Sequence, residues 1–498
     1  MAFLSRYFKA VPLVSKPVPL KVFARTVIAG AILSLNSQLS FAEEAGQAAT
    51  QPLSFEQTIK RALANDPWLN ASRYQQSALE SMSRFSATLP DPKVSVALAN
   101  LGTDKFDFEQ EAMTQLKVGV SQMFPRGDSL QIKQQQLTIQ SQQYPLQRRD
   151  REAKVTVTVG SLWLDAYLAQ ESIALIEKNY ALFEQLSDVA QASYSSALGK
   201  TRQQDIVRAQ LELTRLEDRL VQLKQKQLVY QQKLNQWLLA YQEGLELNQA
   251  FLPADLPGSF SSGVISLGKQ MPELELLRAE LLSAKQQIPA QQLARELMAH
   301  PTLAVFDKKI QAADQGIKLA KQSYLPQWGV NASYGLRGDD AMGNNRADLF
   351  SVGVTFDLPL FTENRQDQLV QAEVFKSEAI KTEKLLLLRQ LMSAFYAGQA
   401  KLKRLEQRSY LYRDELLPQI HLQAEASLTA YTSDDGDFAE VVRARIAELN
   451  AEIDALAIRV GIEKTILELN YLFINAVAVG QSHVPANRSS VVTAGGVS

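Results

Sequence analysis

The octapeptide VGVSQMFP, from Val118 to Pro125, returns as VGVTFDLP from Val352 to Pro359, 234 residues later in a chain of 498 residues. Every even position from Phe350 to Leu360 is apolar, whereas the odd positions carry Ser, Gly, Thr, Asp and Pro. Such strict alternation is typical of a β-strand with one apolar face. Proline has no N–H to donate within a sheet, so we expect each strand to end near this proline. We expect a long helix to follow.

The repetition extends beyond the octapeptides. FEQTIKRALANDPWL from Phe55 corresponds to PAQQLARELMAHPTL from Pro289, with a helix-stopping proline in register in both. Collinear matches at one offset are the signature of an internal repeat. We therefore predict a tandem duplication, with a first unit at 43–240, an inter-repeat equatorial segment at 241–288 and a second unit at 289–475.

Each unit has the same predicted order of elements: a helix, two short alternating segments, and two long helical segments joined by a turn. The strands are expected at about 93–101, 113–124, 327–337 and 349–361. The helical hairpins are expected at about 127–238 and 362–473. The fold class is therefore mainly α with a small β part.

Strands of this length match a tilted strand that crosses an outer membrane. Two ordinary hairpins on a soluble core would show the same alternation. A predicted export signal at 1–42, small or polar residues on the opposite faces, and the presence of only four strands favour the membrane. A barrel needs about eight strands or more to close without edges. Four strands in each chain therefore predict an oligomeric barrel.

The helical segments are unusually long. Helical composition from Gly127 to Leu198 is broken only by Pro145 and would extend roughly 100 Å. The last helix carries a seam with three- and four-residue spacing, typical of coiled-coil packing, at Val442, Ile446, Leu449, Ile453, Leu456 and Val460. A helical hairpin of this length could cross a periplasm.

The chain ends and the composition allow predictions about the cellular location and the binding partners of the protein. Residues 1–42 have a basic region, a short apolar core and small residues before Glu43, which predicts a secretory signal cut after Ala42. A disordered tail followed by an ordinary helix is the alternative. We expect 476–498 to be a disordered tail. A net charge of −1 gives no support for nucleic-acid binding, and the absence of cysteine excludes disulfides, thiolate metal sites and a lipidated N-terminal cysteine.

Catalysis has little support in the sequence. The three histidines His300, His421 and His483 lack metal-ligand spacing, and no glycine-rich phosphate loop joins a strand to a helix. His421 is better interpreted as a surface or packing residue than as a ligand. We therefore predict no enzymatic activity, no cofactor and no metal site.

The combination of a signal, a tandem repeat, and two strands with a long helical hairpin in each repeat resembles the TolC family of outer-membrane efflux channels. The most specific points are SYSSALGKTRQQDIVRAQ from Ser193 and the strand-to-proline junctions at Pro125 and Pro359. The resemblance implies a homotrimer, with a 12-stranded β-barrel in outer-membrane lipid continuous with a periplasmic α-helical barrel. It also implies a passive duct that docks to a periplasmic adaptor (membrane fusion) protein and an inner-membrane pump.

Within the family, LPDPKVSVALAN from Leu89 and FPRGDSLQIK from Phe124 resemble the branch that serves resistance-nodulation-division pumps for heavy metals. This branch implies metal cations as the cargo. A duct for drugs or secreted proteins is an alternative. A structural periplasmic coiled-coil tether without a lumen is an alternative from another class.

The turn of the second hairpin is acidic, with Asp434, Asp435 and Asp437 close together. In a trimer, symmetry would repeat these carboxylates as a ring at the periplasmic aperture, attractive to cations. Tyr431 or Arg443 could hold this aperture closed. Asp437 could instead be only the N-cap of the following helix.

The two hairpin tips are the predicted contacts for the adaptor. In the first tip these residues are Ala197, Leu198, Gly199 and Lys200, and in the second they are Thr432, Ser433 and Gly436.

Overall fold

The computed structural model describes residues 52–195, 203–239, 266–282, 288–340, 342–433 and 436–475. From Leu53 onward these residues belong to one compact unit. The predicted signal at 1–42 and the predicted tail at 476–498 lie outside the described residues. No helix in the described ranges combines the length and the apolar character that crossing a membrane requires.

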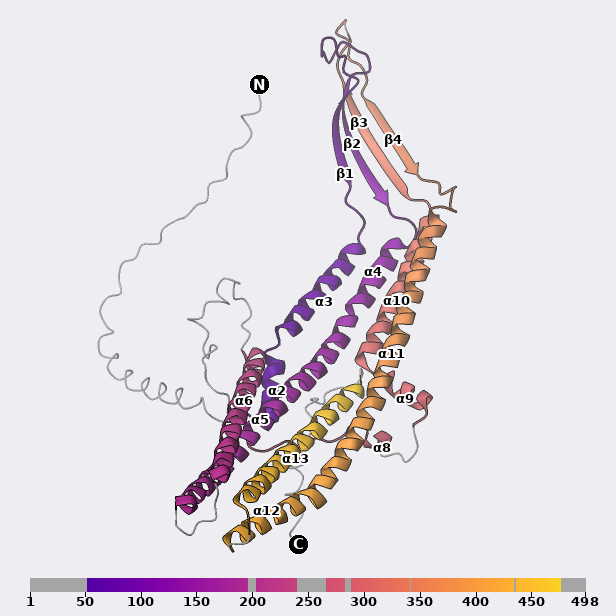
Figure 1. Cartoon of the computed structure of the whole chain (residues 1–498). Coiled ribbons are helices and arrows are strands. Elements are labelled where there is room, and N and C mark those ends of the chain that lie inside the picture. Colours follow the sequence, from indigo (N-terminus) through magenta and orange to yellow (C-terminus); the bar gives the residue numbers. More distant parts are fainter. Residues whose placement is uncertain are drawn as a thin grey trace, which may run out of the picture. The chain divides into compact units, whose positions relative to one another are not determined.

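Four antiparallel strands form one sheet in the order β1-β2-β3-β4 (Figure 1). Their bounds are Lys93–Ala99, Gln115–Phe124, Trp328–Arg337 and Leu349–Phe356. The register places even-numbered residues opposite one another on all four strands, for example Val94, Val120, Ala332 and Val352. The even positions therefore share one face, as the alternation predicts.

We call this surface the apolar sheet face. It consists of Val94, Val96, Leu98, Leu116, Val118, Val120, Val330, Tyr334, Leu336, Phe350, Val352 and Val354, all of them exposed. Val94 exposes 70 % of its surface and Val352 exposes 64 %. No helix of the described chain covers these side chains.

The opposite face carries small and polar residues. Ser95, Gly119, Ser333 and Ser351 lie in one register row. Gly353 faces the longer Asn331, whose Oδ1 atom lies 2.8 Å from the position that a Cβ at Gly353 would occupy. A larger residue would collide there, so glycine makes room for a polar neighbour on this face.

Strand β4 ends at Phe356, five residues earlier than the predicted limit of 361. The Asp357 carboxylate accepts a hydrogen bond from the backbone N–H of Gln327 at 2.6 Å. Beyond it, Pro359 has no N–H for the sheet, and the N–H of Leu360 donates to the carbonyl of Leu358 at 2.9 Å. The backbone therefore turns away although the side-chain alternation continues.

Helices α3 (Pro67–Ser86), α4 (Ser129–Ser141), α10 (Pro301–Lys321) and α11 (Gln366–Leu411) pack side by side in that order (Figure 1). Both α3 and α10 begin with a proline after a capping side chain. The Asp66 carboxylate accepts from the N–H of Trp68, and His300 caps α10. Proline suits the first helical position because its missing N–H would have had no partner there.

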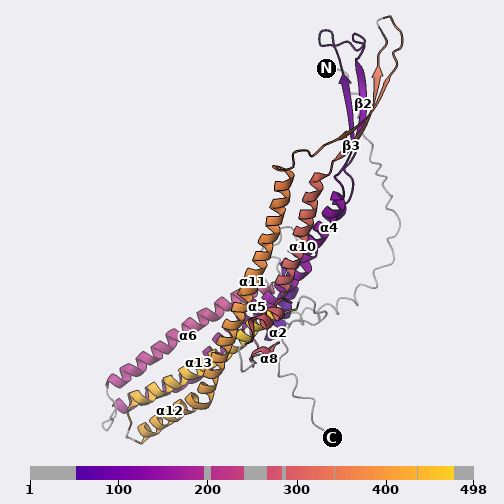
Figure 2. The ribbon, with the colours of Figure 1, turned by 90° about the vertical axis from the view of Figure 1, so that its right-hand side faces the viewer.

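A second row of helices has the order α6-α5-α13-α12 (Figure 2). The bounds are Gln143–Ser195 (α5), Gln203–Leu238 (α6), Leu417–Thr432 (α12) and Phe438–Leu472 (α13). Helix α5 starts before Pro145, so the break from α4 falls at Gln142. A proline in the first helical turn removes an N–H that has no intrahelical acceptor.

The sequence interpretation missed a distortion between α11 and α12. Residues Tyr412–Leu416 form a π-helical turn, and Pro418 is among the first residues of α12. Proline removes a hydrogen bond to the residue four positions earlier, and its ring clashes with that carbonyl. A π-helical turn at this point keeps the helical path while it accommodates the proline.

Two cores hold the helices together. The larger one surrounds Trp163, Phe395 and Leu467 and includes residues of α2 (Phe55–Ala64) and α9 (Ala290–Leu297). It also includes three leucines of the inter-repeat segment, Leu267, Leu274 and Leu281, the last of which lies in α8 (Ala279–Leu282). The smaller one, the hairpin core, joins α5, α6 and α13 through Ile176, Phe183, Leu216, Phe438, Val441, Val442, Leu449 and Ile453. The predicted seam of the last helix therefore contributes directly to a buried core.

The described part of the inter-repeat segment is fastened to α13 by side chains. The N–H of Leu274 donates to Glu463 Oε2 and the N–H of Leu277 donates to Asn470 Oδ1, each at 2.8 Å. Buried carboxylate and amide oxygens require such donors. These bonds hold an irregular segment against the helices.

Candidate functional site at the end of the second hairpin

The predicted aperture and tip residues lie only partly within the described chain. Asp434, Asp435 and the four residues Ala197, Leu198, Gly199 and Lys200 lie outside the described residues. Thr432 is the last residue of α12, Ser433 is its C-cap, and Asp437 precedes α13. The described part of the candidate site is therefore the turn that joins these two helices.

Asp437 is the N-cap of α13. Its Oδ1 atom accepts a hydrogen bond from the N–H of Ala439 at 3.1 Å, and its backbone is extended. An N-cap of this kind contributes about 1 kcal/mol, and its charge is favourable at the positive end of the helix dipole. The capping role, which the sequence left open, is present in the structure.

Tyr431 and Arg443 have separate local partners. The Tyr431 ring packs against Phe438, with ring centroids 5.6 Å apart, at the edge of the hairpin core. Arg443 Nε donates to the carbonyl of Ala439 at 3.1 Å in its own helix. Within the described turn, no hydrogen bond or ion pair joins either residue to Asp437. Because Asp434 and Asp435 lie outside the described residues, the closure of the aperture by Tyr431 or Arg443 stays a prediction.

Gly436 allows the chain to reverse tightly between α12 and α13. A Cβ at this position would lie 2.6 Å from the backbone nitrogen of Tyr431 and 2.8 Å from the carbonyl carbon of Ala430. Backbone atoms cannot move aside as a flexible side chain can. The turn therefore requires glycine for steric reasons.

We predict that Gly436→Ala destabilises the hairpin end by about 1–3 kcal/mol, because the new methyl group overlaps backbone atoms. The matched control is Gly461→Ala in α13, the helix that follows the turn, where a Cβ would lie 3.5 Å from the Leu405 methyl groups in ordinary contact. That control should be neutral or stabilising by up to about 1 kcal/mol. Thermal unfolding of the full chain measures both, and equal melting temperatures would contradict the prediction.

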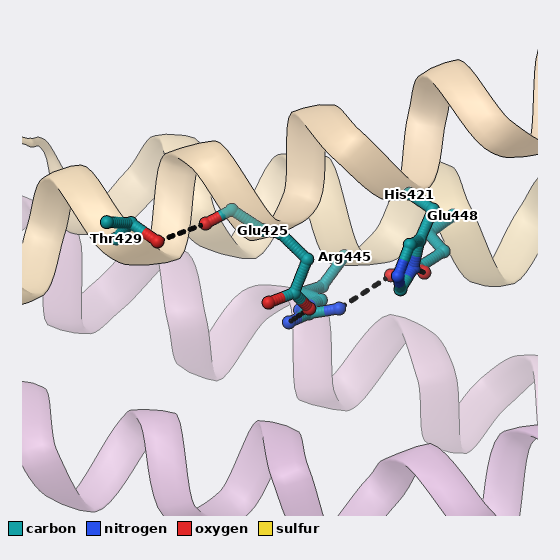
Figure 3. Close-up of polar contacts among 5 residues, drawn as sticks. All are labelled: His421, Glu425, Thr429, Arg445 and Glu448. Carbon is teal, nitrogen blue, oxygen red and sulfur yellow. Dashed lines mark hydrogen bonds and ion pairs between the residues drawn. The ribbon is translucent and has the colours of Figure 1, made fainter.

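Four charged side chains join α12 to α13 beside this turn, and Figure 3 shows that they point toward one another. His421 Nδ1 lies 2.6 Å from Glu448 Oε1. Arg445 donates to Glu448 Oε2 at 2.8 Å and to Glu425 Oε1 at 2.6 Å. We call these four residues the α12–α13 charge cluster. Sequence reasoning missed it, although His421 and Glu425 have the four-residue spacing of helix neighbours.

The electrostatics of this cluster follow from its pairing. The hydrogen bond to Glu448, together with its negative charge, raises the pKa of His421 above its ordinary value. The hydrogen bond from Arg445 lowers the pKa of Glu425. One turn farther along α13, burial raises the pKa of Glu452, and the nearby Glu448 charge adds to the rise. A histidine with a raised pKa binds a proton more readily near neutral pH.

We predict that His421 stabilises the hairpin in a pH-dependent way. Because its pKa is raised in the folded chain, the stabilisation is fully present below the ordinary value of about 6.5 and is lost as the pH rises through the folded pKa. The difference in melting temperature between wild type and His421→Gln, measured from about pH 5.5 to 8.5, should shrink as the pH rises.

Glu425→Gln is the matched control for His421→Gln. It removes one ion pair of the same cluster, but the lowered pKa of Glu425 keeps this carboxylate ionised over that range. The Glu425 charge contributes less than Glu448 does to the raised pKa of His421, so the effect of this variant on the melting temperature should depend on pH less than that of His421→Gln. A pH-independent effect of His421→Gln would show that protonation of this histidine contributes nothing.

The remaining histidine of the described chain is structural. His300 is buried, caps α10 and lies 3.1 Å, through Nε2, from the carbonyl of Tyr471. Burial lowers the pKa of His300. Within the described ranges, no group of three or more His, Asp or Glu side chains could hold a metal ion. The described residues therefore offer no metal centre to this site.

No protein-family model matches the chain, and no curated protein matches its sequence. Solved structures match it closely in fold. CusC, described for its transmembrane channel formation, has a TM-score of 0.64 at 12 % identity, over 84 % of this chain and 92 % of that chain. The CmeC outer membrane channel of Campylobacter jejuni has a TM-score of 0.64 at 12 % identity, over 84 % and 85 %.

The MtrE outer membrane channel of Neisseria gonorrhoeae, solved in its open state, has a TM-score of 0.62 at 11 % identity, over 84 % of this chain and 88 % of that chain. At such low identity the likeness concerns the fold, and it extends over most of both chains. The resemblance that the sequence indicated is confirmed at this level. The chain has the fold of the TolC-like outer-membrane channels.

Proposed function

We propose that the protein is the outer-membrane channel of a tripartite efflux system, a passive duct without enzymatic activity that extends into the periplasm. The apolar sheet face carries this proposal. A contiguous exposed apolar surface is unfavourable in water and marks an interaction site. Apolar side chains outside and small or polar ones inside are what a membrane barrel requires.

We infer that three copies close this barrel. Within the described chain, β1 pairs only with β2 and β4 pairs only with β3, so the sheet has two open edges. Edges cannot remain unpaired in lipid because each unpaired N–H or C=O group costs several kcal/mol. Four strands are too few to close a barrel, and three copies would supply twelve. The likeness in fold to solved outer-membrane channels supports the membrane location of this sheet.

Exposed apolar side chains on the helices also support closure by three copies. The outer members of the first row, α3 and α11, expose large apolar side chains such as Phe85 at 72 % and Phe375 at 63 %. In the second row, Val221 of α6 and Leu422 of α12 are similarly exposed. In a cyclic trimer α11 would meet α3 of the next copy, and α12 would meet α6. Both helical edges would then be buried together with the strand edges.

Cysteine cross-linking tests the trimer, because the native chain has no cysteine. We expect a chain with Ser95→Cys on β1 and Ser351→Cys on β4 to form covalent trimers on oxidation, since both residues face the same side of the sheet. If the register between copies is shifted, Thr355→Cys, on the same side of β4, should replace Ser351→Cys. Denaturing electrophoresis without reductant measures the products.

Ser95→Cys combined with Ser333→Cys is the matched control. Ser333 lies on β3, which is paired on both sides within one chain, so no covalent trimer should form. Cross-linking of the control as efficiently as the edge pairs would refute the ordered closure. Absence of covalent trimers for both edge pairs would also refute the ordered closure.

Ion conductance in planar bilayers tests the duct itself. We expect the purified chain to show heat-modifiable migration in detergent and discrete conductance steps, because a closed barrel resists denaturation and encloses water. A water-soluble elongated rod without conductance would favour the rival function, a periplasmic coiled-coil tether.

We propose that Asp434 and Asp435 form the acidic ring at the periplasmic aperture, with Asp437 held as a helix cap beside them. Three-fold symmetry supports this proposal, since each carboxylate would appear three times around one axis. Asp434→Ala and Asp435→Ala should then reduce block by divalent cations in the same conductance assay. Unchanged block by divalent cations in both variants would refute the acidic ring.

The proposed function also implies two partner proteins, an adaptor and a pump. We infer that the hairpin tips, including Thr432, Ser433 and Gly436, dock to a periplasmic adaptor that connects the duct to a resistance-nodulation-division pump. The second tip is the turn that joins α12 to α13. Single cysteines at the tips should cross-link to the adaptor, and contacts found only at mid-helix would refute this assignment.

We propose metal cations as the cargo, on the strength of the sequence LPDPKVSVALAN and the acidic second turn. Drugs or secreted proteins are the competing cargo. A passive duct does not select what the pump delivers, so the described residues need no binding site for either. Growth of a deletion strain on metal salts and on drugs distinguishes the two, and sensitivity to drugs alone would exclude the metal assignment.

A further inference from the structure

The charged residues of the four strands all carry the same sign. The strands contain three of them, Lys93, Lys117 and Arg337, and no Asp or Glu. All three occupy odd positions, so they share the face that carries Ser95 and Gly119. The face that the proposed barrel turns toward its lumen therefore has a net positive charge.

Lys117 lies among small side chains. In the register it stands between Ala97 on β1 and Gly335 on β3. Its side chain is exposed, and within the described chain its ammonium group has neither a hydrogen bond nor an ion pair. The strand residues one row away on the same face are neutral or positive, namely Ser95, Ala99, Gln115, Gly119, Ser333 and Arg337.

A neighbouring copy brings no negative charge from its strands. In the proposed trimer β1 of one copy meets β4 of the next. The odd positions of β4 are all uncharged, and they are Leu349, Ser351, Gly353 and Thr355. Because β1 also lacks carboxylates, no register between copies can place a strand carboxylate beside Lys117.

The other two positive residues have compensation close by. The Arg337 guanidinium donates to the carbonyls of Ala112 at 2.6 Å and Ala347 at 3.3 Å, and the backbone N–H of Arg337 donates to Asp348 at 3.1 Å. Lys93, at the other end of the sheet, follows Asp91 by two residues, which is roughly 7 Å along an extended chain. Lys117 is therefore the strand charge that is left uncompensated.

The loops beyond the sheet are acidic, but their carboxylates have local partners. Within the described residues, no ion pair joins these loops to Lys117, and the row of Gln115 and Arg337 lies between them. The side-chain pairs in and beside the loops are Asp104 with Gln110, Asp340 with Asn344, and Asp348 with Tyr334. The positive charge of Lys117 is thus not neutralised by the loops.

We propose that three copies of Lys117 form a positive ring inside the barrel, which makes this part of the duct prefer anions to cations. Rings of lysine or arginine select anions in other pores. This inference rests on the proposed trimeric duct and deepens it by naming the charge of what crosses most readily. Carboxylates, phosphates and anionic complexes of a metal ion are favoured over a free cation.

The dimensions of a twelve-stranded barrel allow this ring to act at the pore axis. Strands spaced about 4.8 Å apart and tilted by about 40° enclose a radius of about 12 Å. The lysine side chains project inward from this wall. The Debye length is about 10 Å at 0.1 M salt and about 3 Å at 1 M. The ring therefore influences permeating ions in dilute salt and is screened in concentrated salt.

Reversal potentials in planar bilayers with a KCl gradient test the ring. At about 0.1 M salt, Lys117→Gln should lower the ratio of chloride to potassium permeability about threefold, and Lys117→Glu should lower it further. Lys117→Arg keeps the charge and should leave the ratio unchanged. Near 1 M salt the effect of Lys117→Gln should disappear. The proposed acidic ring at the aperture is present in every variant, so differences between variants report Lys117 alone.

Two matched controls locate the effect. Lys269→Gln removes the same charge from the exposed inter-repeat segment, outside the sheet, and should leave the permeability ratio unchanged. Because the native chain has no cysteine, Lys117→Cys can be labelled with a negatively charged, water-soluble thiol reagent. Labelling should lower the ratio again. Val118→Cys, on the apolar sheet face, should not respond to the same reagent.

Equal permeability ratios for wild type, Lys117→Gln and Lys117→Glu at 0.1 M salt would overturn the proposal. An equal response of Val118→Cys and Lys117→Cys to the reagent would also overturn it, because the odd face would then not be the one that lines the lumen. A chain that conducts ions with unchanged ratios would refute the ring and leave the duct function intact. A chain without conductance would refute the duct, and the ring with it.

Discussion

A four-stranded antiparallel sheet with one exposed apolar face leaves both backbone hydrogen-bonding groups and apolar side chains without partners. Its two edge strands, β1 and β4, leave backbone groups without partners, and its apolar sheet face meets no helix of the described chain. Edge pairing and apolar burial must therefore both come from outside one copy. The two rows of helices share this property, since α3, α11, α6 and α12 expose apolar side chains at the ends of their rows. The proposed trimer would meet both requirements at once, with further copies of the chain around one axis.

The junction between sheet and helices is one of the places where the two halves of the chain contact each other. Arg126, just after β2, pairs with Asp357, just after β4, and also donates to the carbonyl of Leu325 at 2.7 Å. Asp357 in turn fixes the start of β3 through Gln327. These contacts end the strands at a common level and set the starts of α4 and α11.

At the opposite end of α11, a π-helical turn and a proline direct the path of the chain. Pro418 and the π-helical turn before it separate α11 from α12, so the last segment of the hairpin is held to α13 by the hairpin core and by the α12–α13 charge cluster. Arg445 and Glu448 are 13 % and 16 % exposed, whereas His421 is 60 % exposed. The partly buried Arg445 joins α13 to α12 through its ion pair with Glu425. The exposed histidine adds a contribution that depends on protonation.

The sequence by itself determined the local structure. Period-two alternation placed the four strands and their shared face, and the prolines and the heptad-like seams placed the helices, because these patterns depend only on neighbouring residues. It did not determine where β4 ends, since the alternation runs on to Leu360 while the Asp357–Gln327 contact turns the backbone. It also did not reveal that His421 pairs with Glu448 or that Lys117 lies beside Gly335, which comes from a distant part of the chain. Only the tertiary structure decides such contacts, because they depend on how helices and strands far apart in sequence pack against one another.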